Sequence, residues 1–124
     1  MSVAILRQGD YLIASIQSDL SDREVLALRD DIAERVGQYR TLGVVVDVAA
    51  LDVIDSFVAR ALRSIAFTAR LRGAATVIVG IQPDVAVAMV QFRLNLEPLH
   101  AVLDLDEALR FLDARTERFR TDGR

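Results

Sequence analysis

The sequence of 124 residues contains no cysteine, no lysine and only one histidine, His100. Without cysteine, the chain has no disulfides, no thiolate nucleophile and no cysteine-ligated zinc or iron–sulfur site. Without lysine, it lacks the lysine of a Walker A phosphate loop, of a Schiff base and of a phosphoryl-accepting receiver domain. A single histidine excludes a histidine-rich metal site. These absences leave the chain with very little catalytic equipment, and we expect a protein that is not an enzyme and binds no metal.

Long hydrophobic runs and an excess of positive charge are also missing. No apolar run approaches the about 20 residues of a membrane span, and the N-terminus has no signal-peptide pattern. The net charge of −3 argues against a nucleic-acid binder. Hydrophobic residues make up 52% of the chain and charged residues 27%, which excludes a disordered chain. We expect a cytoplasmic protein with one domain over residues 1–114 and a polar tail, 115–124, that frays.

The spacing of apolar residues predicts an α/β fold. Short apolar or β-branched runs predict strands, the first two forming a hairpin, over residues 3–7, 11–16, 43–48, 75–79 and 101–103. Helical spacing predicts helices over 21–39 and 56–71, and helices that begin near 82 and 105. Because strands alternate with helices, we expect a mixed, mostly parallel sheet with an N-terminal antiparallel hairpin and about four helices.

None of the common catalytic or phosphate-binding motifs follows the predicted strands. The segment Gly80-Ile-Gln-Pro83 has neither the GxGxxG nor the GxxxxGK[ST] spacing. No G-x-S-x-G motif for a nucleophilic serine is present. We interpret His100 as a partly buried histidine at the sheet edge, and we expect no catalytic residues.

One segment, Asp52-Val-Ile-Asp55-Ser56-Phe-Val-Ala-Arg60, stands where a loop meets a predicted helix. Ser56 has two interpretations. As a structural residue it is a helix N-cap, which contributes about 1 kcal/mol, with Asp55 as an acidic neighbour. As a functional residue it is a phosphorylation site, because a helix N-terminus presents free N–H groups and accommodates a phosphate.

The predicted helix that follows Ser56 has an unusual outward face. Its apolar side must face the sheet and contains Val58, Leu62, Ile65 and Ala69. The opposite side combines arginines with an aromatic residue, a composition typical of protein-binding surfaces. We therefore predict a partner-binding surface formed by Asp55, Arg60, Arg63, Phe67 and Arg70.

The helix that begins near residue 82 is apolar on two sides. One side contains Pro83, Ala86, Val87, Val90 and Leu94, and the other contains Val85, Met89 and Phe92. A small domain with a single sheet cannot easily bury both sides of a helix. We expect the side with Val85, Met89 and Phe92 to be solvent-accessible in the isolated protomer and to contact another chain.

The segment that ends at Arg60, together with Gly80-Ile-Gln-Pro83, resembles the STAS domain of anti-sigma factor antagonists. Within that family it is most similar to the single-domain scaffold of bacterial stressosomes. The resemblance assigns the family's phosphoacceptor serine to Ser56 and the preceding aspartate to Asp55. Direct antagonists usually continue with small residues such as Ser-Gly-Leu-Gly, whereas this chain continues with Phe57-Val-Ala-Arg60, which favours the stressosome type.

The resemblance implies a non-catalytic scaffold that needs no cofactor and that sequesters a GHKL-type serine/threonine kinase of the RsbT type. Phosphorylation of Ser56 would release the kinase and so regulate a bacterial stress-signalling pathway, and a phosphatase would reset the serine. An RsbR-type STAS paralogue would join a large assembly, with self-association. Two alternatives stay open: a direct anti-anti-sigma factor that binds an anti-sigma kinase, and a STAS module that binds a nucleotide or lipid.

Overall fold

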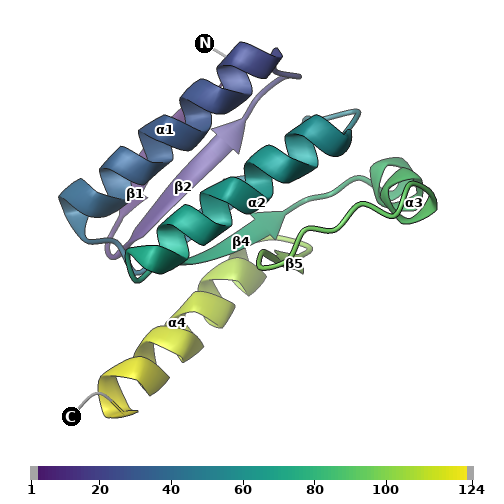
Figure 1. Cartoon of the computed structure of the whole chain (residues 1–124). Helices are drawn as coiled ribbons and strands as arrows, with labels where there is room; N and C mark the ends of the chain where they lie inside the picture. Colours follow the sequence, from purple (N-terminus) through teal and green to yellow (C-terminus); the bar gives the residue numbers. More distant parts are fainter. Residues whose placement is uncertain (1–2, 123–124) are drawn as a thin grey trace.

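The computed structural model describes residues 3–122, with side chains described up to residue 116. Within these residues, strands and helices alternate after an initial hairpin (Figure 1). The strands are β1 (Val3–Gln8), β2 (Tyr11–Ile16), β3 (Gly43–Asp47), β4 (Ala75–Val79) and β5 (His100–Val102). The helices are α1 (Asp22–Tyr39), α2 (Ser56–Leu71), α3 (Pro83–Gln91) and α4 (Leu105–Asp122).

The sheet confirms the predicted fold class. Its strand order is β1-β2-β3-β4-β5, so consecutive strands are neighbours. β1 and β2 pair antiparallel as a hairpin, and each of the other pairs is parallel. Parallel neighbours require crossover connections, which α1, α2 and α3 supply. The carboxyl ends of β2, β3 and β4 therefore meet at one edge of the sheet.

The central strands are buried on both faces of the sheet. Val44 and Val46 of β3 pack into a cluster with α1 and α2, whereas Val45 packs with Ala108 and Leu112 of α4 on the other face. All three valines are fully buried. Figure 1 shows α1 and α2 side by side over the sheet, with α3 beyond its end. This burial explains the continuous β-branched run in the sequence.

The predicted start of α1 is confirmed in detail. Ser21 is the N-cap and accepts a hydrogen bond from the Glu24 N–H at 3.2 Å. The Glu24 carboxylate in turn accepts from the Ser21 N–H at 3.0 Å. This capping box satisfies two N–H groups that the helix itself leaves without a partner.

α4 is longer than the sequence pattern indicates. The helix continues to Asp122, so residues 115–122 of the predicted tail are helical. Residues 123 and 124 lie outside the described residues, and fraying of this end stays a prediction. Leu112 lies so close to β3 that a Cβ on Gly43 would stand 2.8 Å from its methyl groups. The absence of a side chain at Gly43 thus lets α4 approach the sheet.

A polar contact also joins α4 to β2. The Tyr11 hydroxyl donates to Oδ1 of Asp113 at 2.5 Å. Burial, followed by this hydrogen bond, raises the pKa of Tyr11 above its ordinary value of 10.0. The folded chain therefore keeps the Tyr11 proton at a pH at which the unfolded chain releases it.

We predict that the free energy of unfolding falls as the pH rises above about 10, because the unfolded state then binds fewer protons. Lysine and cysteine, which titrate in the same range, are absent from the chain. Tyr11→Phe should be about 1–2 kcal/mol less stable at neutral pH and should lose most of the alkaline slope. Urea unfolding at a series of pH values measures both effects. An unchanged slope in Tyr11→Phe would contradict this assignment.

Candidate functional site

Hydrogen bonds join the loops after β3 and β4 at the carboxyl edge of the sheet. The Val48 N–H donates to the Val79 carbonyl at 2.9 Å, and the Ala49 N–H donates to Oδ1 of Asp47 at 2.9 Å. The Gln82 amide reaches back from the next loop to the Ala49 carbonyl at 2.7 Å. These bonds hold the start of the β3–α2 connection against the start of α3.

The close approach of these two loops requires a glycine at position 80. Gly80 has a φ of +84°, a conformation that residues with a side chain rarely adopt. A Cβ at this position would lie 2.9 Å from Cβ of Ala49 and 3.3 Å from Oδ1 of Asp47. The glycine of the Gly80-Ile-Gln-Pro83 motif thus lets the two loops pack together.

Two buried side chains anchor the rest of the β3–α2 connection. Leu51 and Ile54 belong to the main hydrophobic cluster, and only 3% and 4% of their surface is exposed. Between them Val53 is 61% exposed. The chain therefore enters α2 from a defined position.

Asp55, not Ser56, caps α2. Its Oδ1 accepts a hydrogen bond from the Val58 N–H at 2.8 Å, and its carbonyl accepts from the Ala59 N–H at 2.9 Å. The interpretation of Ser56 as N-cap is therefore wrong. Ser56 is the first residue of the helix, and its side chain is exposed. Within the described residues its hydroxyl forms no hydrogen bond.

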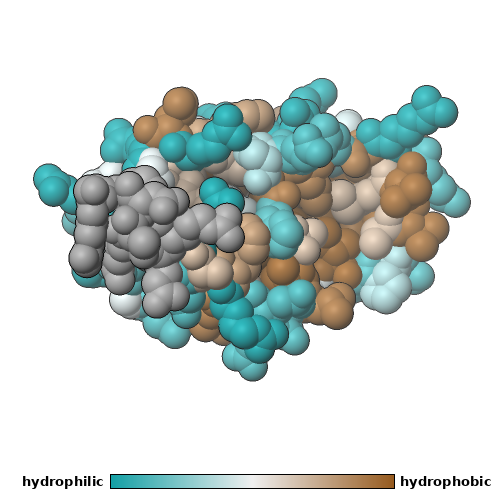
Figure 2. Space-filling model, turned by 90° about the horizontal axis from the view of Figure 1, so that it is seen from below, coloured by the Kyte–Doolittle hydropathy of each residue, from teal (hydrophilic) through white to brown (hydrophobic). Residues whose placement is uncertain are grey.

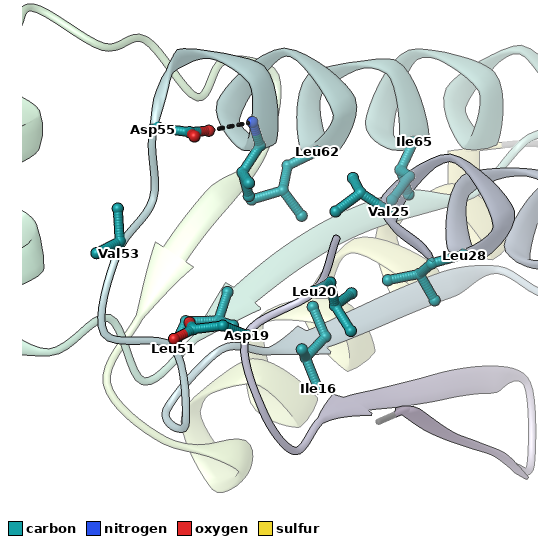
Figure 3. Close-up of a pocket in the computed structure, with 11 residues that line it drawn as sticks. Ile16, Asp19, Leu20, Val25, Leu28, Leu51, Val53, Asp55, Leu62 and Ile65 are labelled. Carbon is teal, nitrogen blue, oxygen red and sulfur yellow. Dashed lines mark hydrogen bonds between the residues drawn. The ribbon is translucent and has the colours of Figure 1, made fainter. Parts of the chain in front are cut away.

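An apolar hollow of about 240 Å³ lies beneath this helix start, between α1 and α2 (Figure 3). Leu20, Val25 and Leu62 are among the side chains that line it, and the carboxylates of Asp19 and Asp55 are the charged groups in its lining. The Asp52 N–H donates to Asp19 at 3.3 Å. Because no cationic side chain lines the hollow, it does not suit the phosphates of a nucleotide.

The outward face of α2 presents most of the predicted partner surface. Arg60 and Arg70 are exposed, and Phe67 is 44% exposed. The Arg70 guanidinium lies 5.8 Å from the centroid of the Phe67 ring. Arg63 differs, because it is half-buried and its Nε donates to the Glu97 carbonyl at 2.9 Å. Arg63 thus ties α2 to the segment before β5 and is less available to a partner.

The predicted accessible side of α3 is wrong for two of its three residues. Val85 and Met89 are 3% and 7% exposed and belong to the main core, whereas Phe92 is 75% exposed. The opposite stripe faces solvent instead, with Val87 57% and Val90 78% exposed. Both stripes are apolar, so their spacing alone cannot decide which side packs on the domain.

His100 also differs from its predicted environment. It is exposed at the start of β5, and its ring stacks on Phe111 of α4 with the centroids 4.0 Å apart. Within the part of the chain that the structure describes, no three histidine or acidic residues are arranged to hold a metal ion. Over the same part, no helix has the length and apolar content needed to cross a membrane.

The cap assignment predicts different effects for two substitutions of Asp55. Asp55→Ala should lower the free energy of unfolding by about 1 kcal/mol, because the Val58 N–H loses its acceptor. Asp55→Asn should retain most of the stability, because the amide oxygen still accepts that bond. Thermal unfolding of both variants tests the assignment, and equal losses in the two would contradict it.

Comparison with known proteins agrees with this geometry. The sequence matches the STAS domain family over residues 2–108. No curated protein matches. A structure of RsbS from Moorella thermoacetica, with one serine replaced by glutamate, is 30% identical, covers 94% of this chain and 99% of that chain, and has a TM-score of 0.79.

Two further structures are similar. A structure of the stressosome, described as a signal integration and transduction hub, is 28% identical over 91% of this chain and 98% of that chain, with a TM-score of 0.71. The unphosphorylated anti-sigma factor antagonist SpoIIAA has a TM-score of 0.72 over 90% of this chain and 96% of that chain. At 12% identity this second likeness shows the fold alone. The chain belongs to the STAS-domain family, and within it resembles RsbS and a stressosome component.

Proposed function

We propose that this chain is a stressosome scaffold that holds a GHKL-type serine/threonine kinase and releases it when Ser56 is phosphorylated. The observation that carries the proposal is the position of Ser56 as the exposed first residue of α2. STAS-domain antagonists are generally non-catalytic, so the chain acts as a substrate and binding partner.

The geometry at Ser56 suits a phosphoacceptor. A kinase must bring the acceptor oxygen in line with its γ-phosphate, which requires an accessible hydroxyl. Asp55 already caps α2 and two buried side chains anchor the loop, so the kinase meets a preformed segment. The free N–H groups and the dipole of the helix start stabilise a phosphate there. We therefore expect phosphorylation to leave the fold intact.

The consequence of phosphorylation falls on the partner. It adds about −1.5 to −2 charges at Ser56, next to the carboxylate of Asp55. A kinase surface that accepts a neutral hydroxyl must then bury an unpaired charge. Such a change costs about 2–5 kcal/mol at an interface, or roughly 30-fold to a few thousand-fold in affinity. This loss is sufficient to release a kinase held at micromolar affinity.

Arg60 is the cation that acts against this switch. It lies one turn after Ser56 on the exposed side of α2. Residues four apart on a helix are neighbours, so its guanidinium can reach a phosphate on Ser56. Arg60→Ala should therefore make release more complete.

The similar structures support the scaffold and the switch. The RsbS structure is of a variant with glutamate in place of a serine, a substitution that adds negative charge as phosphorylation does. The stressosome structure is of an assembly, and we infer that this chain joins an RsbR-type STAS paralogue in a comparable particle. A separate phosphatase would return Ser56 to its neutral form.

The direct test measures binding of an RsbT-type kinase to wild type, Ser56→Ala and Ser56→Asp by calorimetry. We expect Ser56→Ala to bind as wild type does and Ser56→Asp to bind at least about tenfold more weakly, because it carries part of the phosphate charge. Gln38→Glu is the matched control, since it adds the same charge at the exposed far end of α1. Equal affinity of all four proteins would refute the proposed switch.

A further inference from the structure

The outward face of α3 is an apolar surface that nothing in the described chain covers. Val87 and Val90 are 57% and 78% exposed, and Phe92, directly after the helix, is 75% exposed. The two valines border a shallow hollow of about 300 Å³ whose lining is completed by Ala86 and Gln91. Figure 2 shows hydrophobic surface at the right-hand end of the molecule, where α3 lies.

The two ends of this surface carry opposite charges. Asp84, the one charged residue of α3, lies three residues before Val87, and Arg93 lies three residues after Val90. Both are exposed, and within the described residues neither forms an ion pair. At about 1.5 Å per residue, the two charges lie roughly 13 Å apart along the helix.

The backbone holds Arg93 in place. Its φ is 55°, and its N–H donates to the Val90 carbonyl at 3.1 Å. The Leu94 N–H donates to the Met89 carbonyl at 2.9 Å. These two bonds form a Schellman motif, which ends the helix at a defined point. The backbone that carries Arg93 therefore has a defined position at the end of the helix.

We propose that α3 is a self-association surface on which the α3 of a second copy packs antiparallel, about a two-fold axis between Ala88 and Met89. That axis sets Val87 against Val90 of the second copy, and Asp84 against Arg93 of the second copy. The equal spacing of three residues at each end makes both pairings occur together. Each contact occurs twice, as in any isologous interface.

The charge pattern favours a second copy over another kind of partner. A basic partner surface would attract Asp84 and repel Arg93, and an acidic surface would do the reverse. A copy of α3 that runs in the opposite direction satisfies both ends and covers the valines between them. Helix α3 carries no other charge that such a pairing would bury.

The contact is expected to be weak by itself. A stable interface buries about 800 Å² on each partner, which is more than a single nine-residue helix offers. In a particle with many copies, weak contacts add through effective concentration. This inference deepens the assembly part of the proposed function, and it is measured without a kinase, so its failure is separate from a failure of the Ser56 switch.

Charge reversal tests the proposed pairing. In a dimer of either single variant, Asp84→Arg or Arg93→Asp, like charges face each other at both ends of the contact. Each variant should therefore self-associate about tenfold more weakly than wild type. Sedimentation equilibrium at high protein concentration measures this. An equimolar mixture of the two variants should associate as wild type does, because each of the two charge contacts in the mixed pair then joins an arginine to an aspartate. The Asp84→Arg/Arg93→Asp double variant should also self-associate.

Val87→Glu should abolish self-association. Val87 is exposed, so this substitution should not disturb folding, and thermal unfolding of every variant checks that the domain remains folded. A wild-type chain that stays monomeric at millimolar concentration would overturn the proposal. So would self-association that is insensitive to Val87→Glu, or a variant mixture that associates no better than its components. If the wild type is monomeric and Val87→Glu no longer binds an RsbR-type paralogue, this surface binds the paralogue and not a second copy.

Discussion

The parallel pairing of β3 with β4 is buried on both faces, and this burial determines where the helices around it must lie. Parallel strands need a crossover, so α2 must run back over the sheet between them. Val44 and Val46 on one side and Val45 on the other must all be removed from water, which requires a helical layer on each face. Together with the parallel pairing of β2 with β3, the β3–β4 pairing brings the loops that follow β2, β3 and β4 to one edge.

At that edge the structure combines a well-anchored loop with an exposed serine. Leu51 and Ile54 anchor the loop in the core, and Asp55 ends it by capping α2. Ser56, one residue further, reaches solvent without taking part in any of these contacts. Under the proposed switch, a phosphate on Ser56 is therefore accommodated by the helix start, and its effect falls on the partner.

Most of the fold could be predicted from the sequence, because the strands and helices up to α3 have clear apolar spacing and the Ser21–Glu24 capping box marks a helix start. The cap of α2 and the packed side of α3 could not. Asp55 and Ser56 are adjacent and both are good caps, so only the backbone shows which one bonds to Val58. In α3 both stripes are apolar, and the packing of Met89 against the core, which spacing does not report, decides the orientation.

The most direct test of the central claim starts from the complex of this chain with an RsbT-type kinase. After ATP is added, phosphate incorporation and kinase release are measured together. The account predicts one phosphate, on Ser56, with the kinase leaving as the phosphate appears and the far-ultraviolet circular dichroism of the isolated phosphorylated chain unchanged. A kinase that stays bound to chains fully phosphorylated on Ser56, or that leaves while Ser56 is still unmodified, would contradict it.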